Sequence, residues 1–571
     1  MSLFSINFVQ IRRLSLIVKV PNYGKQKKYR GQSVTYGELK KREAALNKPK
    51  RFTKNTAESL YPPIEHLDKR QKKQQIVHEE IKNLETVEEK IFKINMPRYY
   101  GWKSLILHEH NIQYNSLPYV QQITRTHIVK ESGLPAYYDN VISNDQLDNI
   151  VQEIKGSVED NIAFEYCRRK RDETKMEMLN ENNEHFKTKK FIQKINRTIL
   201  IHLSSKYPHL LNAEVDYEPR LEASWFLGGL EPSARHRMVR KKNKCLRKFA
   251  DEPVTIPVQY DGHPVMHLRH KHPLREIVPL SECTNPAYDV PTYEFSPETL
   301  GYKFGLQHLT NIPGFWPGDE SEFGLLSYHT CKNLEDRTKK YNDITDYYAT
   351  LSAQAILASY SWLLSQACYQ GFSTYNDITY PLTTQTVITN GKSWSFCVYQ
   401  LNTILLHSQH VKENPKRNMC WITEPLKLFD KIENEKIHGL NEQVLKTLVK
   451  FYVNAPEERQ DVNLKPYLGE SVKVIADIEH DERRNWLEKQ YKHLMCNRSR
   501  HRRIPEIYQW QKIYMIQHKT RPMEKRREPW QFGINVMHRR LDDHTPRYVP
   551  KCLRENPKKK RIGRWEKTYY P

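Results

Sequence analysis

The sequence lacks the features by which most enzymes and membrane proteins are recognised. None of its 571 residues belongs to an apolar run long enough to cross a bilayer. The best candidate, residues 351–369, is interrupted by serine and glutamine side chains, which is typical of a buried helix. No nucleophile elbow, phosphate-binding loop or protein-kinase motif set occurs. The sequence therefore offers no support for a catalytic centre, and we expect no cofactor.

Cysteine is sparse as well. Nine cysteines are scattered singly, none forms a Cys-x-x-Cys pair, and their number is odd. This spacing argues against a disulfide framework and against a zinc site built from local cysteine pairs. Reduced thiols are typical of the cytosol, the nucleus or the mitochondrial matrix.

Positive charge is abundant, and it is concentrated at the two ends of the chain. The formal net charge is +24. Residues 1–54 carry 14 Lys and Arg against 2 Asp and Glu, and residues 497–571 carry 21 against 7, which leaves residues 55–496 at a net charge of -2. A neutral body with cationic ends is typical of a protein that binds a polyanion, most often a nucleic acid. A merely solvated tail is the alternative interpretation.

The amino-terminal segment has the pattern of a targeting signal. Acidic side chains are absent before Glu38, and residues 3–20 interleave apolar side chains with serines and a pair of arginines. An amphipathic, arginine-bearing and acid-free start is typical of a mitochondrial presequence, and the arginine pair interrupts the apolar run that a secretory signal needs. We predict a presequence-like segment over residues 1–37 and a basic arm over residues 38–60. A basic disordered tail is the alternative.

A β-hairpin is predicted over residues 386–401. Residues 386–389 are all β-branched, and residues 393–401 alternate bulky apolar side chains with small ones. Between them, Asn390 and Gly391 tolerate the positive φ values of a type I′ turn. The aromatic side chains on one face of the second strand imply that this face is buried.

The rest of the chain alternates helical patterns with short strand candidates. Residues 64–92 form a charged, helical pattern whose narrow apolar stripe suggests packing on a partner or on the body by one face. The predicted helices are residues 144–178, 184–207, 343–370 and 441–453, and residues 254–260 read as a strand. The third helix stops at Gly371, which suits the position after a helix C-terminus.

This order of elements indicates an α+β fold. We expect a mixed globular body whose core contains the β-hairpin and the buried helix, flanked by extended basic N- and C-terminal segments. The body should cover residues 61–456, and residues 457–571 should form a basic, aromatic-rich extension.

The densest basic segment of the neutral body lies between Glu231 and Asp251. It holds eight Lys and Arg and no acid, and a Gly-Gly pair and a proline ahead of it indicate an exposed loop. Such a cluster can neutralise closely spaced phosphates and make binding strongly salt-dependent. A solvated charge run is the alternative. The predicted RNA-binding residues here are Arg235, Arg237, Arg240, Lys241, Lys242, Lys244, Arg247 and Lys248.

The carboxyl-terminal tail interleaves cations with tryptophan and tyrosine. Aromatic side chains can stack on unpaired bases while arginine and lysine bind the backbone. No RNA-recognition, KH or Cys/His finger signature is present, so no base preference follows. The predicted RNA-binding residues of the tail are Arg500, Arg502, Arg503, Arg526, Arg527, Arg539, Arg540, Lys558, Lys559, Lys560 and Arg561.

One group of histidines raises an alternative of a different class. His263, His267, His270 and His272 lie close together in the sequence. Imidazoles bind zinc, but a metal site needs converging ligands and usually a supporting carboxylate, and here cationic neighbours oppose a dication. We therefore expect no metal and prefer a polar loop or an RNA contact. An RNA-processing or nucleolytic enzyme that uses this histidine-rich loop remains the alternative function.

Several phrases between residues 366 and 421 resemble a known family. They are Gln366-Ala367 with Tyr369-Gln370-Gly371-Phe372, Val387 to Lys392, Tyr399-Gln400-Leu401-Asn402-Thr403, and Asn414-Pro415 with Asn418 and Cys420-Trp421. On these residues the chain resembles the mitochondrial ribosomal protein family also called programmed cell death protein nine. The likeness runs, more thinly, from about residue 60 to about residue 456.

The resemblance implies a structural constituent of the mitochondrial ribosome, located in the mitochondrial matrix, and not an enzyme. The family was first numbered thirty of the small subunit and later placed in the large subunit, so the resemblance implies a large-subunit protein. The implied partners are the mitochondrial large-subunit rRNA and other mitochondrial ribosomal proteins, especially the related large-subunit protein thirty-seven. One family name also suggests a regulatory apoptosis factor, but no residue argues for that role.

Overall fold

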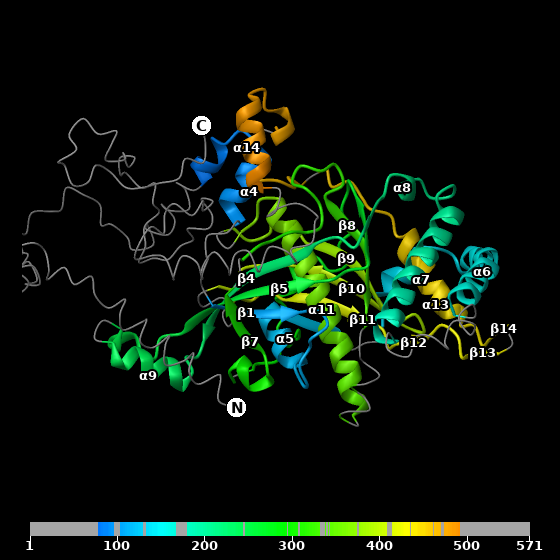
Figure 1. Ribbon diagram of the computed structural model, residues 1–571, viewed down its shortest axis with the longest axis horizontal. Helices are drawn as coiled ribbons and strands as arrows, with labels where there is room; N and C mark the ends of the chain where they lie inside the picture. Colours follow the sequence, from blue (N-terminus) through cyan, green and yellow to red (C-terminus); the bar gives the residue numbers. More distant parts are fainter. Residues whose placement is uncertain are drawn as a thin grey trace, which may run out of the picture. The chain divides into compact units, whose positions relative to one another are not determined.

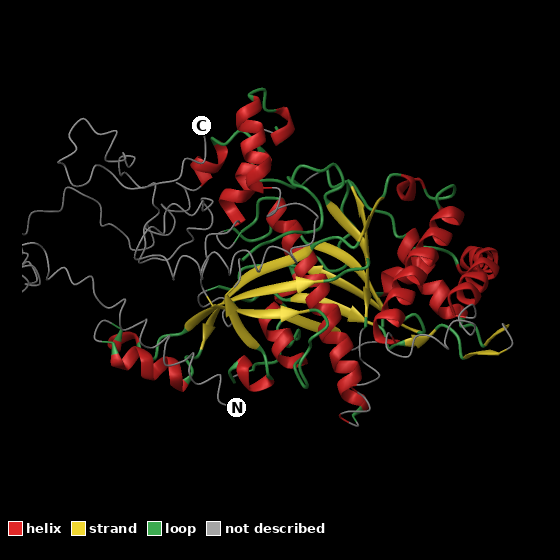
Figure 2. Ribbon diagram, viewed as in Figure 1, coloured by secondary structure: helices red, strands yellow, loops and turns green. Residues whose placement is uncertain are grey.

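The computed structural model describes most of the predicted body. The described residues are 78–95, 103–129, 133–166, 180–243, 246–293, 295–306, 309–331, 337, 341, 343–373, 376–407, 414–433, 436–460, 462–469 and 473–491. The predicted presequence-like segment, the basic arm after it and the tail from residue 492 lie outside them. Helices and mixed sheets build the described part, which confirms the α+β fold (Figures 1 and 2).

The larger sheet is mixed and has eight strands. Its order is β2-β11-β10-β9-β8-β6-β3, with β12 also paired to β10. The pairs β8–β9 and β2–β11 are parallel and the remaining pairs are antiparallel. The strands are β2 (Thr126–Val129), β3 (Glu214–Tyr217), β6 (Met266–His270), β8 (Phe323–Thr330), β9 (Leu382–Thr389), β10 (Ser393–Leu401), β11 (Asn418–Ile422) and β12 (Leu426–Lys427).

The smaller sheet has four strands in the order β4-β5-β1-β7. They are β1 (Lys103–His108), β4 (Leu221–Leu230), β5 (Val254–Gly262) and β7 (Lys303–Leu306), of which β1 and β5 are parallel. Strand β5 confirms the strand predicted over residues 254–260. A separate pair is formed by β13 (Lys431–Glu433) and β14 (Lys436–His438).

Helix α11 (Ile344–Tyr369) lies between the two sheets and contacts strands of both (Figure 1). It begins where the carboxylate of Asp343 accepts a hydrogen bond from the backbone N–H of Thr345 (2.8 Å). It ends before Gly371, whose φ of 94° lets the N–H of Phe372 reach the carbonyl of Ala367. Residues 353–370 are all buried, so the predicted buried helix and its stop at Gly371 are confirmed.

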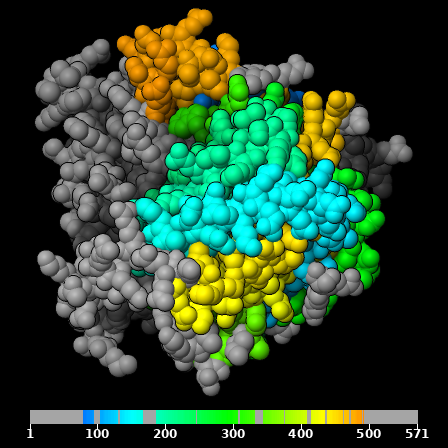
Figure 3. Space-filling model, turned by 90° about the vertical axis from the view of Figure 1, so that its right-hand side faces the viewer, coloured from blue at the N-terminus to red at the C-terminus, as the bar shows by residue number. Residues whose placement is uncertain are grey.

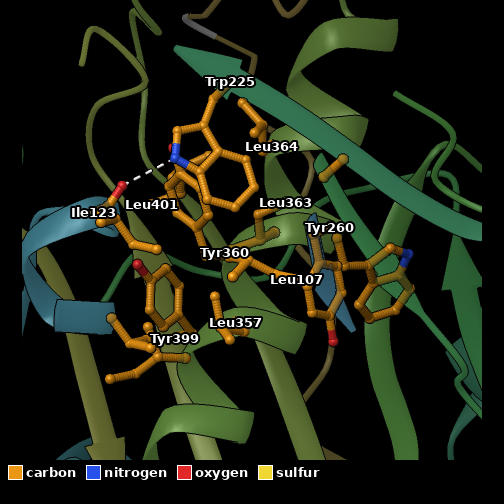
Figure 4. Close-up of a cluster of buried hydrophobic side chains, with 14 of the residues drawn as sticks. Leu107, Ile123, Trp225, Tyr260, Leu357, Tyr360, Leu363, Leu364, Tyr399 and Leu401 are labelled. Atoms are coloured by element: carbon orange, nitrogen blue, oxygen red, sulfur yellow. Dashed lines mark hydrogen bonds between the residues drawn. The ribbon is translucent and has the colours of Figure 1, made fainter. Parts of the chain in front are cut away.

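Aromatic and leucine side chains from both sheets close around α11. Figure 4 shows Trp225 of β4 and Tyr260 of β5 gathered with Tyr360 of the helix and Tyr399 of β10. The indole N–H of Trp225 donates to the carbonyl of Ile123, at 3.0 Å. Helix α5 (Leu117–Thr124), which ends there, is thereby attached to the same core. The helix and the hairpin form the core, as predicted.

A layer of helices covers the other face of the larger sheet (Figure 3). It consists of α6 (Asn144–Tyr166), α7 (Asn180–Leu203) and α13 (Glu442–Val453), and the short helix α8 (Pro208–Leu211) follows α7. These helices confirm those predicted near residues 144, 184 and 441. The end of the first prediction, residues 167–178, lies outside the described residues.

The predicted hairpin is present as β9 and β10, with two corrections. Its turn is centred one residue later than expected, on Gly391 and Lys392, and of the turn residues only Gly391 has a positive φ (92°). Asn390 is the first residue of the turn, and its side-chain oxygen accepts from the N–H groups of Lys392 and Ser393. Positive φ at the first central residue alone is the pattern of a type II′ turn, not type I′. Both strand faces are buried, because α11 covers one and the helical layer covers the other.

The amino-terminal end of the described body packs against its carboxyl-terminal end. Helix α4 (Val87–Asn95) and helix α14 (Asp481–Tyr491) contribute to one apolar cluster. The ammonium group of Lys90 donates to the carbonyl of Leu468 (2.6 Å). The carboxylate of Glu88 accepts from the indole of Trp316 (2.7 Å) and from the backbone of Ile475 (3.1 Å).

This cluster bears out the narrow apolar stripe predicted for residues 64–92, whereas the helix predicted there is interrupted at residues 83–86 and resumes as α4. Ile81, Val87 and Ile91 are buried in it. Residues 64–77 lie outside the described residues.

The described part of the chain also contains short 3-10 turns: η2 (Ala136–Asp139), η5 (Arg247–Phe249), η6 (Glu282–Thr284), η7 (Pro297–Leu300) and η8 (Ile475–Asp477).

Gly324 of β8 sets how closely α11 approaches the larger sheet. A Cβ atom at this position would lie 2.4 Å from the ring of Trp362 and 2.7 Å from the amide nitrogen of Gln366. We expect Gly324→Ala to lower the free energy of unfolding by about 1–3 kcal/mol through overpacking. Gly156→Ala is the matched control, because that exposed helical glycine has open space around it and should gain about 0.5–1 kcal/mol. Thermal and denaturant unfolding measure both. Equal effects would contradict this account of the packing.

Glu88 gives the fold a predicted pH dependence. Burial raises the pKa of its carboxyl, and the hydrogen bonds from Trp316 and Ile475 offset this only in part. The folded state therefore holds this proton more tightly than the unfolded state, and stability falls as pH rises from the ordinary carboxyl pKa through the raised one. Because Glu88→Gln cannot ionise, its melting temperature relative to the native protein should be higher at about pH 8 than at about pH 5. Glu79→Gln, an exposed change nearby, is the control. A pH-independent difference for Glu88→Gln would rule out this role.

Candidate nucleic-acid interface

The predicted basic loop is a helical projection between β4 and β5, called the arm here and defined as residues 231–253. It contains α9 (Ala234–Lys242) and the turn η5, and Figure 1 shows α9 beyond the ends of the two strands. The hydroxyl of Ser233 accepts a hydrogen bond from the backbone N–H of His236 (3.3 Å) and caps the helix. Basic side chains in the last turn suit the negative end of the helix dipole. The expectation of an irregular loop was wrong, since α9 carries no apolar stripe from which a helix could be predicted.

Three arginines of the arm are engaged within it. The guanidinium of Arg240 donates to the carbonyls of Phe249 (2.9 Å) and Glu252, and Arg247 donates to the carbonyl of Lys241 (3.2 Å). Arg237 lies 3.4 Å from a carboxylate oxygen of Asp251 and 3.7 Å from one of Glu231. These contacts hold η5 and the residues just before β5 against α9. The arginines therefore maintain the shape of the arm.

Three lysines of the arm are placed differently. Lys241, Lys242 and Lys248 are exposed, and their ammonium groups make no ion pair or hydrogen bond within the described part of the chain. An unpaired ammonium on a long, flexible side chain can reach a phosphate without disturbing the fold. The arm thus presents three available positive charges on a scaffold that arginines hold in shape.

The four histidines of the alternative function do not converge on one site. The imidazole of His267 is buried and stacks on Trp362, with ring centres 4.0 Å apart, whereas His263 is exposed. His270 is buried beside His272, and the backbone N–H of His272 donates to its ring. Burial lowers the pKa of both His267 and His270, with further contributions from neighbouring histidines, so the uncharged forms are favoured. This arrangement suits side chains packed in a core.

The buried pair of Glu109 and His329 was missed by the sequence analysis. Their side chains lie 2.6 Å apart, and Glu109 also accepts from the amide of Gln354 (3.1 Å) and from the backbone of His263 (2.5 Å). Burial alone would raise the pKa of Glu109, but His329 outweighs it and holds the pKa well below its usual range. These bonds join β1, β8, α11 and the turn before β6. The sequence around Glu109, which reads His108-Glu109-His110, gives no sign of a partner as distant as His329.

No group of three or more His, Cys, Asp or Glu is arranged to hold a metal ion in the described ranges. Within the same ranges, every helix is too short or too polar to cross a bilayer.

Comparison with known families supplies what the geometry alone does not. The model of the family described as mitochondrial 28S ribosomal protein S30 (PDCD9) matches residues 30–456, which is more than half of the chain. The chain belongs to this family. Membership makes it a mitochondrial ribosomal protein of the mitochondrial matrix, with a structural role in translation.

The same match corrects one prediction. The description names the 28S, or small, subunit, whereas we expected a large-subunit protein. The assignment to the large subunit is therefore contradicted. The large-subunit rRNA and protein thirty-seven are not supported as partners, whereas membership implies binding to rRNA and other ribosomal proteins. The phrases used for the resemblance carried information on the family but none on subunit position.

The predicted RNA-binding residues fall into three groups. Arg237, Arg240 and Arg247 hold the arm together, and Lys241, Lys242 and Lys248 extend from it; of Arg235 only the backbone in α9 is described. All remaining predicted residues lie outside the described residues and stay predictions: Lys244, Arg500, Arg502, Arg503, Arg526, Arg527, Arg539, Arg540, Lys558, Lys559, Lys560 and Arg561.

The division between arginines and lysines can be tested by hydrogen exchange. We expect Arg240→Gln to speed amide exchange in residues 246–253 by about two- to tenfold, because each lost hydrogen bond contributes about 0.5–1.5 kcal/mol. Lys242→Gln removes the same charge from the same helix and should leave exchange unchanged. Mass spectrometry of peptides from the arm measures both. Equal exchange in the two variants would contradict a structural role for Arg240.

Proposed function

We propose that this chain is a structural constituent of the mitochondrial ribosome whose arm contacts rRNA phosphates through Lys241, Lys242 and Lys248. Family membership supports the ribosomal role, and the arm supports the mode of contact. The observation that carries the proposal is that these lysines have no partner on the described surface, whereas Arg237, Arg240 and Arg247 each have one. Ribosomal RNA offers the closely spaced phosphates that such lysines neutralise.

The basic termini fit the same function. Residues 497–571 carry a net charge of +14 by the same count of Lys and Arg against Asp and Glu, and they interleave cations with aromatic residues. We propose that this tail follows rRNA, its cations on phosphates and its aromatics on unpaired bases. We also propose that residues 1–37 direct the chain to the matrix. They are followed by the N-terminal basic arm over residues 38–60, which is separate from the arm over residues 231–253. The body over residues 61–456 would then lie within the family match, which also covers residues 30–60.

The enzymatic alternative has no observation in its favour. A hydrolytic site built on the histidine-rich loop would need His267 and a carboxylate to meet in a position that substrate can reach. His267 is instead enclosed by Trp362 and the close approach of Gly314. The other histidines of the loop lie apart from it.

Neutralising the three lysines tests the proposal. We expect the combined change Lys241→Gln, Lys242→Gln and Lys248→Gln to weaken incorporation into ribosomal particles. The slope of log affinity for RNA against log salt should fall by about 2–3, because each phosphate contact contributes about 0.7–0.9. Density-gradient sedimentation of mitochondrial extracts, with and without RNase, measures incorporation, and titration at several salt concentrations measures the slope.

The matched control removes the same charge elsewhere. Lys303, Lys392 and Lys427 are exposed and lie outside the arm. Their change to glutamine should leave both sedimentation and salt slope near those of the native protein. If the two triple variants have equal effects, the arm acts only through the net charge of the protein and does not contact rRNA phosphates specifically. Absence of the native chain from ribosomal particles would defeat the proposed function. The same gradient separates the two subunits and so tests the subunit named for the family.

A further inference from the structure

The arm exposes apolar side chains as well as charge. Thirteen large apolar side chains are exposed among the described residues, and four of them lie between residues 238 and 249. These four are Met238 (53% exposed), Val239 (60%), Leu246 (42%) and Phe249 (45%). Single exposed apolar residues are ordinary, but a group on one projecting element indicates an interaction surface.

Phe249 is the aromatic member of this group, and its backbone is firmly held. Its N–H bonds to the carbonyl of Leu246 (3.0 Å), and its own carbonyl accepts from the guanidinium of Arg240 (2.9 Å). The exposed ring is therefore carried by a fixed turn. One of the unpaired lysines, Lys248, is in that turn and directly precedes Phe249. A second, Lys241, is joined to the turn, because its carbonyl accepts from Arg247 (3.2 Å).

An exposed ring next to unpaired cations matches the chemistry of a nucleotide that is not base-paired. Its base can stack on the ring while its phosphates meet the ammonium groups. A duplex hides the faces of its bases, and a protein partner would have to provide carboxylates for the lysines as well as an apolar pocket. We propose that Phe249 stacks on an unpaired RNA base while Lys241 and Lys248 neutralise the adjacent phosphates. This inference rests on the proposed function and specifies the kind of RNA that the arm binds.

The test measures RNA binding at the arm itself, because the basic ends of the full-length protein also attract RNA. The probes are an unstructured RNA of about 12 nucleotides and the same strand annealed to its complement. Hydrogen-exchange protection of residues 246–253 is followed as each probe is titrated. We expect the single strand to protect this segment at a concentration at least about fivefold lower than the duplex does.

Substitutions then separate stacking from charge. Phe249→Leu keeps an apolar side chain but loses the ring, so it should raise the single-strand concentration needed for half protection by about fivefold or more. Phe249→Tyr retains the ring and should behave as the native protein does. Lys248→Gln should weaken protection by both probes.

The outcomes distinguish this inference from the function on which it rests. Equal protection by the two probes, or an unchanged Phe249→Leu variant, would overturn base stacking while leaving the phosphate contacts in place. If the protein is lost from ribosomal particles with Met238→Ser and Val239→Ser but not with Phe249→Leu, base stacking is overturned in favour of a protein partner. If neither probe protects the arm of the native protein, both this inference and the proposed contact between the arm and rRNA are overturned. The ribosomal role is decided separately, by co-sedimentation of the protein with ribosomes.

Discussion

The enclosure of α11 between two sheets is the constraint on which the rest of this structure depends. From Ala353 to Gln370 the chain has no solvent-facing side, so hydrogen bonds to buried polar side chains of this segment must come from the surrounding elements. Gln354 donates to the carbonyl of Thr330 (3.0 Å), Ser365 to that of Glu222 (2.7 Å), and Gln366 accepts from the N–H of Gly324 (3.0 Å). Each bond joins the helix to a particular strand position, so the two sheets are fixed relative to one another. Strands β4 and β5 are thereby anchored at one end, and the arm continues from the other end.

The arm illustrates why arginine and lysine have different uses on one short helix. A guanidinium offers several donors in a fixed plane and can hold two carbonyls at once, as Arg240 does. An ammonium is a compact charge on a flexible chain and needs no particular geometry to meet a phosphate. Counting basic residues in the sequence treats the two as equal. Of the eight basic residues in this cluster, three arginines bond within the arm and three lysines extend from it, so the number of charges in the sequence overstates the number available to a partner.

Sequence patterns predicted those elements whose signals are local. The helix start near Asp343, the stop at Gly371 and the alternation along β10 each depend on neighbouring residues, and each was located within a residue or two. The turn at Gly391 was placed one residue early, because Asn-Gly suits either of two turn types until the strand register is known. The pair of Glu109 and His329 could not be predicted, since 220 residues separate them. Helix α9 was missed because its charged surface lacks the apolar period on which the prediction depends.

The family match ends before the packed body does, so the end of the match is not a domain boundary. The match ends at residue 456, yet Arg459 donates to the carbonyls of Pro381 (2.7 Å) and Leu274 (2.8 Å). Leu468 lies against Gly371, where a Cβ atom would be 2.8 Å from its side chain. Residues after the match therefore cover the end of α11, and the cluster that contains α4 needs them for its burial. A segment recognised only by its composition as an extension thus contributes to the same core.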